Sequence, residues 1–245
     1  MHSKTLLFEL CSQSRESARA AERGGADRIE LCSGLDLGGI TPGPALIEDV
    51  IQAVSLPIHV LIRPRPGDFV YSSPELTLML RQVEQAKQAG AAGVTLGVLL
   101  AGGRVDVERT LALVEHARPM QVTFHRAFDE TRDLGEALED VILTGADYLL
   151  TSGGVCDVLA GAETIARLAR QAGERIQIIA GGGLRLASLP EVIRRSGIFA
   201  VHGSLTRESG NGASFVPDAL ERDIREAVRL LRAHSAGLAQ RPMTI

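Results

Sequence analysis

The sequence predicts an α/β protein of the (β/α)₈ or TIM-barrel class, built as a single domain. Eight short apolar runs alternate with segments of helical period, at the spacing of roughly 30 residues that consecutive βα units show. Several of the helical segments end in glycine directly before an apolar run. Two glycine-rich turns, "IIAGGGL" and "VHGS", come late in the chain, after the seventh and eighth runs. Together these observations favour a closed barrel.

The strands are predicted from the residues that precede each apolar run. Four runs follow a helical segment ending in glycine, in "ERGGADRIELC", "KQAGAAGVTLGVL", "LTGADYLLTSGG" and "RRSGIFAVHGS". Glycine after a helix, followed by β-branched and aliphatic residues, is typical of a turn into a buried strand. The other runs are "TLLFELCS" at the N-terminus and "LPIHVLIRPR", "RPMQVTFHRAF" and "ERIQIIAGGG", which follow proline or a charged residue. The predicted strands are 6–12, 27–32, 57–63, 93–98, 120–125, 147–152, 176–180 and 199–203.

The starts of the predicted helices agree with this alternation. Thr41-Pro42 and Ser73-Pro74 each join an N-cap residue to a proline at the first helical position. Asp133 and Glu136 have the spacing of a capping box. These signals place helices between the apolar runs.

An open doubly wound sheet is the alternative architecture, and it would favour a phosphate-binding glycine motif after the first strand. That turn reads "CSQSRES" and contains no glycine, so no nucleotide cofactor is indicated. Many barrels hold an anionic group at turns after their seventh and eighth strands, where this chain has its glycines. No long linker interrupts residues 1–245, which we interpret as one barrel domain. Its last helix is expected at about 217–234, and the tail 235–245 is expected to be disordered.

Composition and charge exclude several classes of partner. The 245 residues carry a net charge of −4 and only 3% aromatic residues, which argues against nucleic acid. The apolar run at the N-terminus is short and is broken by Glu9, so neither a signal peptide nor a membrane span is expected. Three scattered cysteines do not form a disulfide framework. We therefore expect a cytoplasmic protein with reduced thiols.

Polar residues gather at the C-terminal ends of the predicted strands, where barrels build their sites. Because side chains alternate along a strand, this set should point inward together. Buried carboxylates are costly unless they are paired, so these side chains should form a mutual network around a cavity. The predicted inward residues are Glu9, Glu30, Arg63, Arg65, His125 and His202.

One hypothesis makes this network an enzyme site for a small phosphorylated or carboxylated compound, with a lyase, isomerase or hydrolase reaction. Glu9 or Glu30 would act as general base or as ligand to a divalent metal, and His125 and His202 as acid/base groups or ligands. Arg63 and Arg65 would clamp an anion. Backbone N–H groups of the late glycine turns would cradle it. The remaining predicted contacts to this ligand are Asp68, Arg126, Ser152, Gly182, Gly183, Gly203 and Ser204.

A purely structural interpretation stays open for each of these features. The glutamates could pair with Arg63 and Arg65 to stabilise the barrel. The two histidines could be satisfied within the core, and the glycines could serve only tight turns. Asp68 could form an Asx-turn, and Asp129 could be an ordinary loop residue.

Five strings resemble a known family in their order and spacing: "GGADRIELCSGL", "GGITP", "IRPRPGDFVYS", "VTFHRAFD" and "LTSG". From about Leu7 to Ser204 the chain resembles the CutC family, which is named for copper homeostasis. The resemblance implies a TIM barrel, a cytoplasmic protein, a homo-oligomer that we expect to be a dimer, and a proposed role in copper handling. The chain departs from the family's "IRPRGGDF" at Pro66, and the resemblance does not extend to the tail after Ser204.

The resemblance also implies a copper site. The family's proposed copper(I) ligands match Cys11 and Cys32, and soft thiolates suit copper(I). Strand alternation aims both thiols inward, and we expect them to share an ion only if the strand register sets them side by side. If the register offsets them, they are expected to be small core residues.

Overall fold

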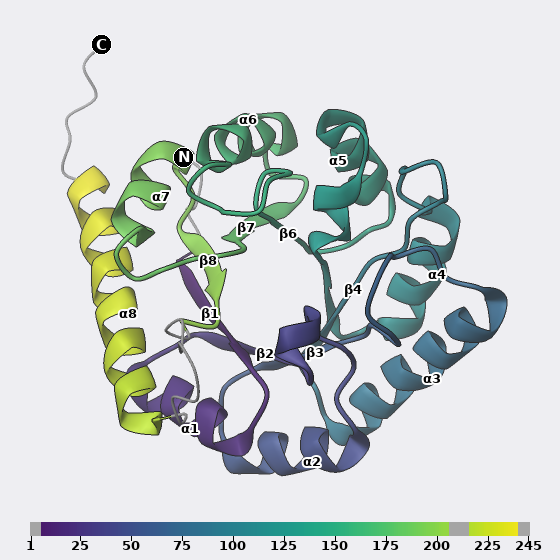
Figure 1. Cartoon of the computed structure of the whole chain (residues 1–245), viewed down its shortest axis with the longest axis horizontal. Coiled ribbons are helices and arrows are strands. Elements are labelled where there is room, and N and C mark those ends of the chain that lie inside the picture. The colour runs from purple at the N-terminus through teal and green to yellow at the C-terminus, as the bar shows by residue number, and fades with distance from the viewer. Residues whose placement is uncertain (1–5, 206–215, 240–245) are drawn as a thin grey trace.

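The computed structural model describes residues 6–205 and 216–239 and contains a closed barrel of eight parallel strands inside a ring of helices (Figure 1). Each strand pairs with the next along the chain, and the eighth pairs back with the first. The predicted fold class is therefore confirmed. The strands are β1 (Leu7–Ser12), β2 (Arg28–Leu31), β3 (Ile58–Leu61), β4 (Gly93–Leu96), β5 (Gln121–Phe124), β6 (Tyr148–Thr151), β7 (Gln177–Gly181) and β8 (Ala200–Gly203). The helices are α1 (Arg15–Gly24), α2 (Pro44–Ala53), α3 (Ser73–Ala89), α4 (Val107–Ala117), α5 (Leu134–Leu143), α6 (Ala162–Ala172), α7 (Leu189–Ser196) and α8 (Pro217–Ala239), with 3₁₀ turns η1 (Leu35–Leu37) and η2 (Arg126–Glu130).

Helix boundaries differ from expectation at three places. The helix α2 starts at Pro44, because the Thr41 hydroxyl accepts a hydrogen bond from the Arg63 backbone N–H and does not cap the helix. The N-cap of α3 is Ser72, one residue before the predicted one. The Asp133 cap of α5 is confirmed. The last helix, α8, runs to Ala239, beyond the expected end at 234, so residues 235–239 are helical, while 240–245 lie outside the described residues.

The main hydrophobic core lies between the outer face of the barrel and the helices. Alternate strand residues such as Phe8 and Phe124 are fully buried there. Truncating either to alanine would cost about 3–5 kcal/mol. Gly25 and Gly90 end α1 and α3 with φ of 85° and 89°, a conformation that suits glycine and turns the chain back into a strand.

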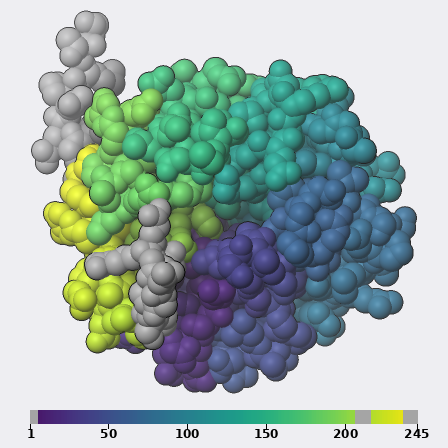
Figure 2. Space-filling view, in the orientation of Figure 1, coloured from purple at the N-terminus to yellow at the C-terminus, as the bar shows by residue number. Residues whose placement is uncertain are grey.

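The interior of the barrel is filled differently from this outer layer. Its base is closed by a small apolar cluster of Leu7, Leu150, Ile179 and Ala200. Above that cluster the inward side chains are mostly polar. These polar side chains continue to the C-terminal mouth of the barrel. Figure 2 shows a hollow near the centre of this face of the molecule, between the purple and the green segments.

Candidate functional site

A cavity of about 400 Å³ opens at the C-terminal mouth of the barrel. It brings together most of the predicted site residues from strands that are distant in sequence. Those that line it are Cys11, Glu30, Cys32, Arg63, His125, Arg126, Gly182, Gly183, His202, Gly203 and Ser204. Glu9, Arg65, Asp68 and Ser152 are not brought to its wall.

The corner of the cavity formed by β1, β2 and β8 holds the two cysteines. Their sulfur atoms lie 3.5 Å apart, and both residues are buried. The register does not set the two cysteines side by side, because the Cα partner of Cys11 is Glu30. Side chains lean along a strand, so the thiol of Cys32, beyond the end of β2, still reaches that of Cys11.

Three potential metal ligands meet in the same corner. One donor atom each from Cys11, Glu30 and His202 lie within 4.8 Å of one another, and all three residues are buried. The Nε2 atom of His202 is 3.7 Å from a Glu30 carboxylate oxygen. We call these three residues the Cys–Glu–His cluster.

Glu9 lies beneath this cluster and is fully buried. Its carboxylate contacts His202 Nδ1 at 2.8 Å and accepts a hydrogen bond from Arg28 Nε. The Arg28 guanidinium also lies 4.4 Å from the centre of the Tyr148 ring. Sequence analysis missed Arg28, although the predicted strand 27–32 contains it and it shares the inward face of β2 with Glu30. The structural interpretation that paired Glu9 with Arg63 or Arg65 is wrong, since Arg28 is its arginine partner.

The pKa shifts follow from this arrangement. Burial alone would raise the pKa of Glu9, but Arg28 and His202 outweigh it and hold that pKa below its ordinary value. Burial raises the pKa of Glu30, and the nearby Glu9 adds to the shift. Burial opposes protonation of His202, yet Glu30 and Glu9 raise its pKa. The bond to Cys32, burial and Glu30 together raise the pKa of the Cys11 thiol.

The arginines on the β3 side are used by the protein itself. Arg63 lines the cavity, but its terminal nitrogens donate to the carbonyl oxygens of Leu37, Gly38, Gly39 and Gly67. Arg65 donates to Glu75 in the first turn of α3 and to Asp68 in its own loop. Asp68 also accepts from the Val70 N–H, as an Asx-turn residue does. The predicted two-arginine clamp therefore has only Arg63 at the cavity.

Arg126 is held at the cavity by a buried carboxylate. Asp129 accepts hydrogen bonds from Arg126 Nε, from the Ser152 hydroxyl and N–H, and from the Thr151 hydroxyl. A Cβ on Gly182 would lie 2.9 Å from the Arg126 guanidinium carbon, so this glycine makes room for the arginine. Asp129, left open as a loop residue, is thus the anchor of the β5 and β6 ends.

The inward histidines each face a glycine on a neighbouring strand. A Cβ on Gly93 would lie 2.4 Å from His59 Nε2, and one on Gly97 would lie 2.7 Å from His125 Nδ1. His125 Nδ1 accepts from the Ala127 N–H, and its Nε2 is buried with no hydrogen-bond partner among the described residues. Burial, with Arg63 adding to it, lowers the pKa of His125 to about 3.

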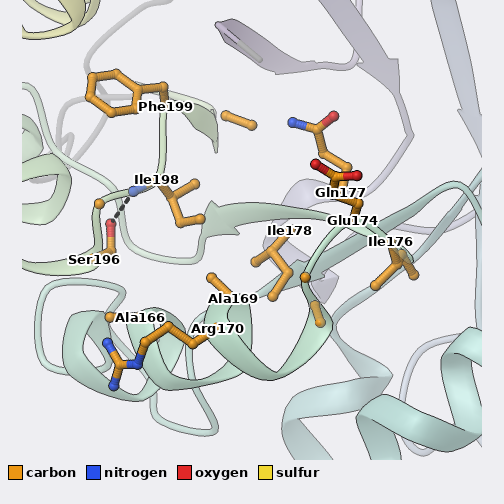
Figure 3. Close-up of a pocket in the computed structure, with 14 residues that line it drawn as sticks. Ala166, Ala169, Arg170, Glu174, Ile176, Gln177, Ile178, Ser196, Ile198 and Phe199 are labelled. Atoms are coloured by element: carbon orange, nitrogen blue, oxygen red, sulfur yellow. Dashed lines mark hydrogen bonds between the residues drawn. The ribbon is translucent and has the colours of Figure 1, made fainter. Parts of the chain in front are cut away.

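A second cavity, of about 480 Å³, lies at the opposite end of the barrel (Figure 3). It is bounded by α6, the start of β7 and the turn into β8, where the Ile198 N–H bonds the Ser196 hydroxyl at 3.1 Å. Its lining is largely apolar, with Arg170 and Glu174 among the few charged residues. Because barrels build their sites at the C-terminal end, the mouth cavity is the candidate functional site.

Comparisons with known proteins agree with this fold. A family model described as "CutC family" matches residues 6–207. The human protein named "Copper homeostasis protein cutC homolog" is 45% identical over 83% of this chain and 76% of its own length. A protein of Caulobacter vibrioides named as a family protein CutC is 39% identical over 95% of this chain and all of its own. The crystal structure of a CutC protein from Streptococcus agalactiae has a TM-score of 0.78 at 26% identity, covering 82% of this chain and all of that one.

The fold and the mouth cavity define a TIM-barrel protein with a thiol-containing polar site. The chain belongs to the CutC family. A 4-hydroxy-2-oxoglutarate aldolase, with a TM-score of 0.60 at 19% identity, shares the fold alone. Within residues 6–205 and 216–239, no helix combines the length and apolar character that crossing a membrane requires.

Proposed function

We propose that the protein binds copper(I) through Cys11 and Cys32 at the barrel mouth and takes part in copper homeostasis in the cytoplasm. The observation that carries this proposal is the 3.5 Å separation of the two sulfur atoms at the cavity wall. Thiolate is the protein ligand that best suits copper(I). The name of the human relative supports the same role. The expected cytoplasmic homodimer stays a prediction.

The sulfur separation also limits the geometry of a bound ion. With metal–sulfur bonds of about 2.3 Å, sulfurs 3.5 Å apart subtend roughly 100° at the metal. A linear copper(I) ion needs them about 1 Å further apart. Binding in that geometry therefore requires one of the two buried thiols to shift.

Binding must also displace protons from the thiols. Because the pKa of Cys11 is raised by its bond to Cys32, by burial and by Glu30, the thiol is protonated at neutral pH. Copper(I) affinity is therefore expected to increase with pH.

The test is a copper(I) titration of the full reduced chain against a competing chelator. The parent should bind one equivalent, and the Cys11→Ser, Cys32→Ser double variant should lose it. Cys156→Ser is the matched control, because Cys156 is exposed and away from the cavity wall. Equally tight binding by the parent and the double variant contradicts the proposal.

A small anion is the second candidate ligand. With such a ligand the protein would be an enzyme, acting as a lyase, isomerase or hydrolase. The observation that favours it is the Arg126 guanidinium held at the cavity between Gly182 and Ser152. Inorganic phosphate should stabilise the parent against heat. Ser204→Asp should lose that effect through repulsion. Arg65→Gln, outside the cavity, should keep it.

A further inference from the structure

The Cys–Glu–His cluster has the spacing of a metal site even without the second cysteine. Tetrahedral coordination with bonds of about 2.0–2.3 Å places neighbouring ligand atoms roughly 3.3–3.6 Å apart. The separation of 3.7 Å between His202 Nε2 and Glu30 is close to that value, and one donor atom from each of the three residues lies within 4.8 Å of the other two. Small side-chain adjustments bring all three atoms to one ion.

The imidazole of His202 is oriented by a carboxylate on its far side. Glu9 contacts Nδ1 at 2.8 Å, which places a proton there and leaves Nε2 pointing toward Glu30. Ligating histidines are commonly fixed in this way by a carboxylate. Glu9 is in turn held by Arg28, so the support of the ligand is itself rigid.

The charge of the buried cluster selects the type of ion. Glu9 is balanced by Arg28, so a Cys11 thiolate and the Glu30 carboxylate leave two negative charges in a buried place. A divalent cation bound by this ligand set neutralises both charges, whereas a monovalent cation bound by the same set leaves one uncompensated, which burial makes costly. A mixed sulfur, nitrogen and oxygen ligand set is one that zinc accepts.

The cluster is open on one side. All three residues line the cavity at the barrel mouth, so the fourth coordination position faces that space. Three protein ligands with one open position is the arrangement of zinc sites that act on a bound water or carbonyl oxygen.

We propose that Cys11, Glu30 and His202 form a zinc site of this open kind, with Glu9 as the positioning residue of His202. Binding of Zn²⁺ releases the proton of the Cys11 thiol, and any proton on Glu30 or on His202 Nε2, to solvent. The proposal does not rest on the copper(I) pair, because it uses only one of the two cysteines.

The experiment separates the two proposals on the same full-length, reduced and metal-free protein. Zn²⁺ affinity is measured by competition with a chelator, and Co²⁺ is used as a spectroscopic probe of thiolate ligation. The parent should bind one equivalent of Zn²⁺ and show thiolate-to-cobalt charge transfer. Glu30→Gln, His202→Gln and Cys11→Ser should each lower the Zn²⁺ affinity by at least about 100-fold. Glu9→Gln should lower it by about 10–100-fold.

Two cysteine variants are the controls. Cys32→Ser should change Zn²⁺ affinity by less than about threefold and keep the cobalt spectrum, while it weakens copper(I) binding. Cys156→Ser should change neither metal. Parental Zn²⁺ affinity in Glu30→Gln and His202→Gln, or equal losses in Cys32→Ser and Cys11→Ser, would overturn the proposal. If the ligand variants do not fold, the parent decides: an absent thiolate-to-cobalt band is a contradiction.

Discussion

The two sides of the barrel mouth use charged residues in opposite ways. On the β1, β2 and β8 side, Glu30 and His202 present donor atoms to the cavity while Glu9 and Arg28 hold them from below. On the β3 side, the Arg63 guanidinium reaches the same cavity, but its terminal nitrogens donate hydrogen bonds to backbone carbonyls. One side offers ligands, and the other keeps the loops in place.

The difference shows that a charge at a strand end does not by itself make a binding residue. What decides is whether the fold already occupies its donors and acceptors. His202 keeps Nε2 directed at Glu30 and the cavity, because Glu9 engages only the other nitrogen. Arg65, by contrast, is fully engaged with Glu75, Asp68 and the backbone of its own loop.

The largest expected effect comes from the support beneath the ligand side. Arg28→Met leaves the buried Glu9 carboxylate without its arginine, and breaking a buried ion pair costs about 3–5 kcal/mol. Urea unfolding measures the loss. Arg194→Met, which breaks an exposed pair with Glu191 on α7, is the control and should change stability far less. Equal losses of unfolding free energy in the two variants would mean that the buried Arg28–Glu9 pair does not support the site.

The loop side should separate stability from ligand binding. Arg63→Met removes charged hydrogen bonds to the carbonyls of Leu37, Gly38 and Gly39, at a cost of roughly 2–3 kcal/mol. Its Zn²⁺ affinity should stay within about threefold of the parent, because Arg63 touches none of the three ligands. Urea unfolding and chelator competition give both numbers. A stable variant with weakened metal binding would reverse the contrast between the two sides.

The fold could be predicted because its signals are local. Glycine after a helix, as at Gly25 and Gly90, and an apolar run behind it are read over a few residues, and they identify each βα unit. Strand alternation then placed Glu30 and His202 inward correctly, since that depends only on parity. Strand ends were less certain, and β3 stops at Leu61 where 63 was expected.

The contacts between the side chains of the site could not be predicted from such local signals. The partners of Arg63 are carbonyls at Leu37 to Gly39, and they depend on the path of a loop that periodicity does not describe. The approach of Cys11 to Cys32 depends on side-chain direction across offset strands. Arg28 was missed because it lies at the N-terminal start of its strand, whereas the predicted site residues were taken from the C-terminal strand ends. The partners of Arg63 and the approach of the two thiols follow from tertiary contacts, whereas the inward parity of Arg28 could have been derived from the sequence.

The buried ring of His59 should make the stability of the protein depend on pH. Burial, with Arg28 adding to it, lowers the pKa of His59 to about 4, so the folded protein keeps this ring neutral. In the unfolded chain it is protonated below about pH 6.5, and stability is therefore lost as pH falls from that value toward 4. Between pH 7 and 5 the loss due to His59 is about 2 kcal/mol. Urea unfolding at several pH values measures this effect. Between pH 7 and 5, the unfolding free energy of His59→Gln should fall by about 2 kcal/mol less than that of the parent. An equal fall in both proteins would contradict the buried neutral ring.

The smallest effect is expected at Asp68, which the sequence placed among the ligand contacts. Its side chain is 67% exposed, and among the described residues it bonds only Arg65 and the Val70 N–H of its own loop. Asp68→Ala should therefore leave Zn²⁺, copper(I) and phosphate binding unchanged, with no resolvable shift in the urea midpoint. Arg126→Gln is the matched comparison, since Arg126 lines the cavity and should lose phosphate stabilisation. A loss of phosphate binding in Asp68→Ala would mean that the surface loop closes over the ligand, and the division of the mouth into a ligand side and a loop side would then fail.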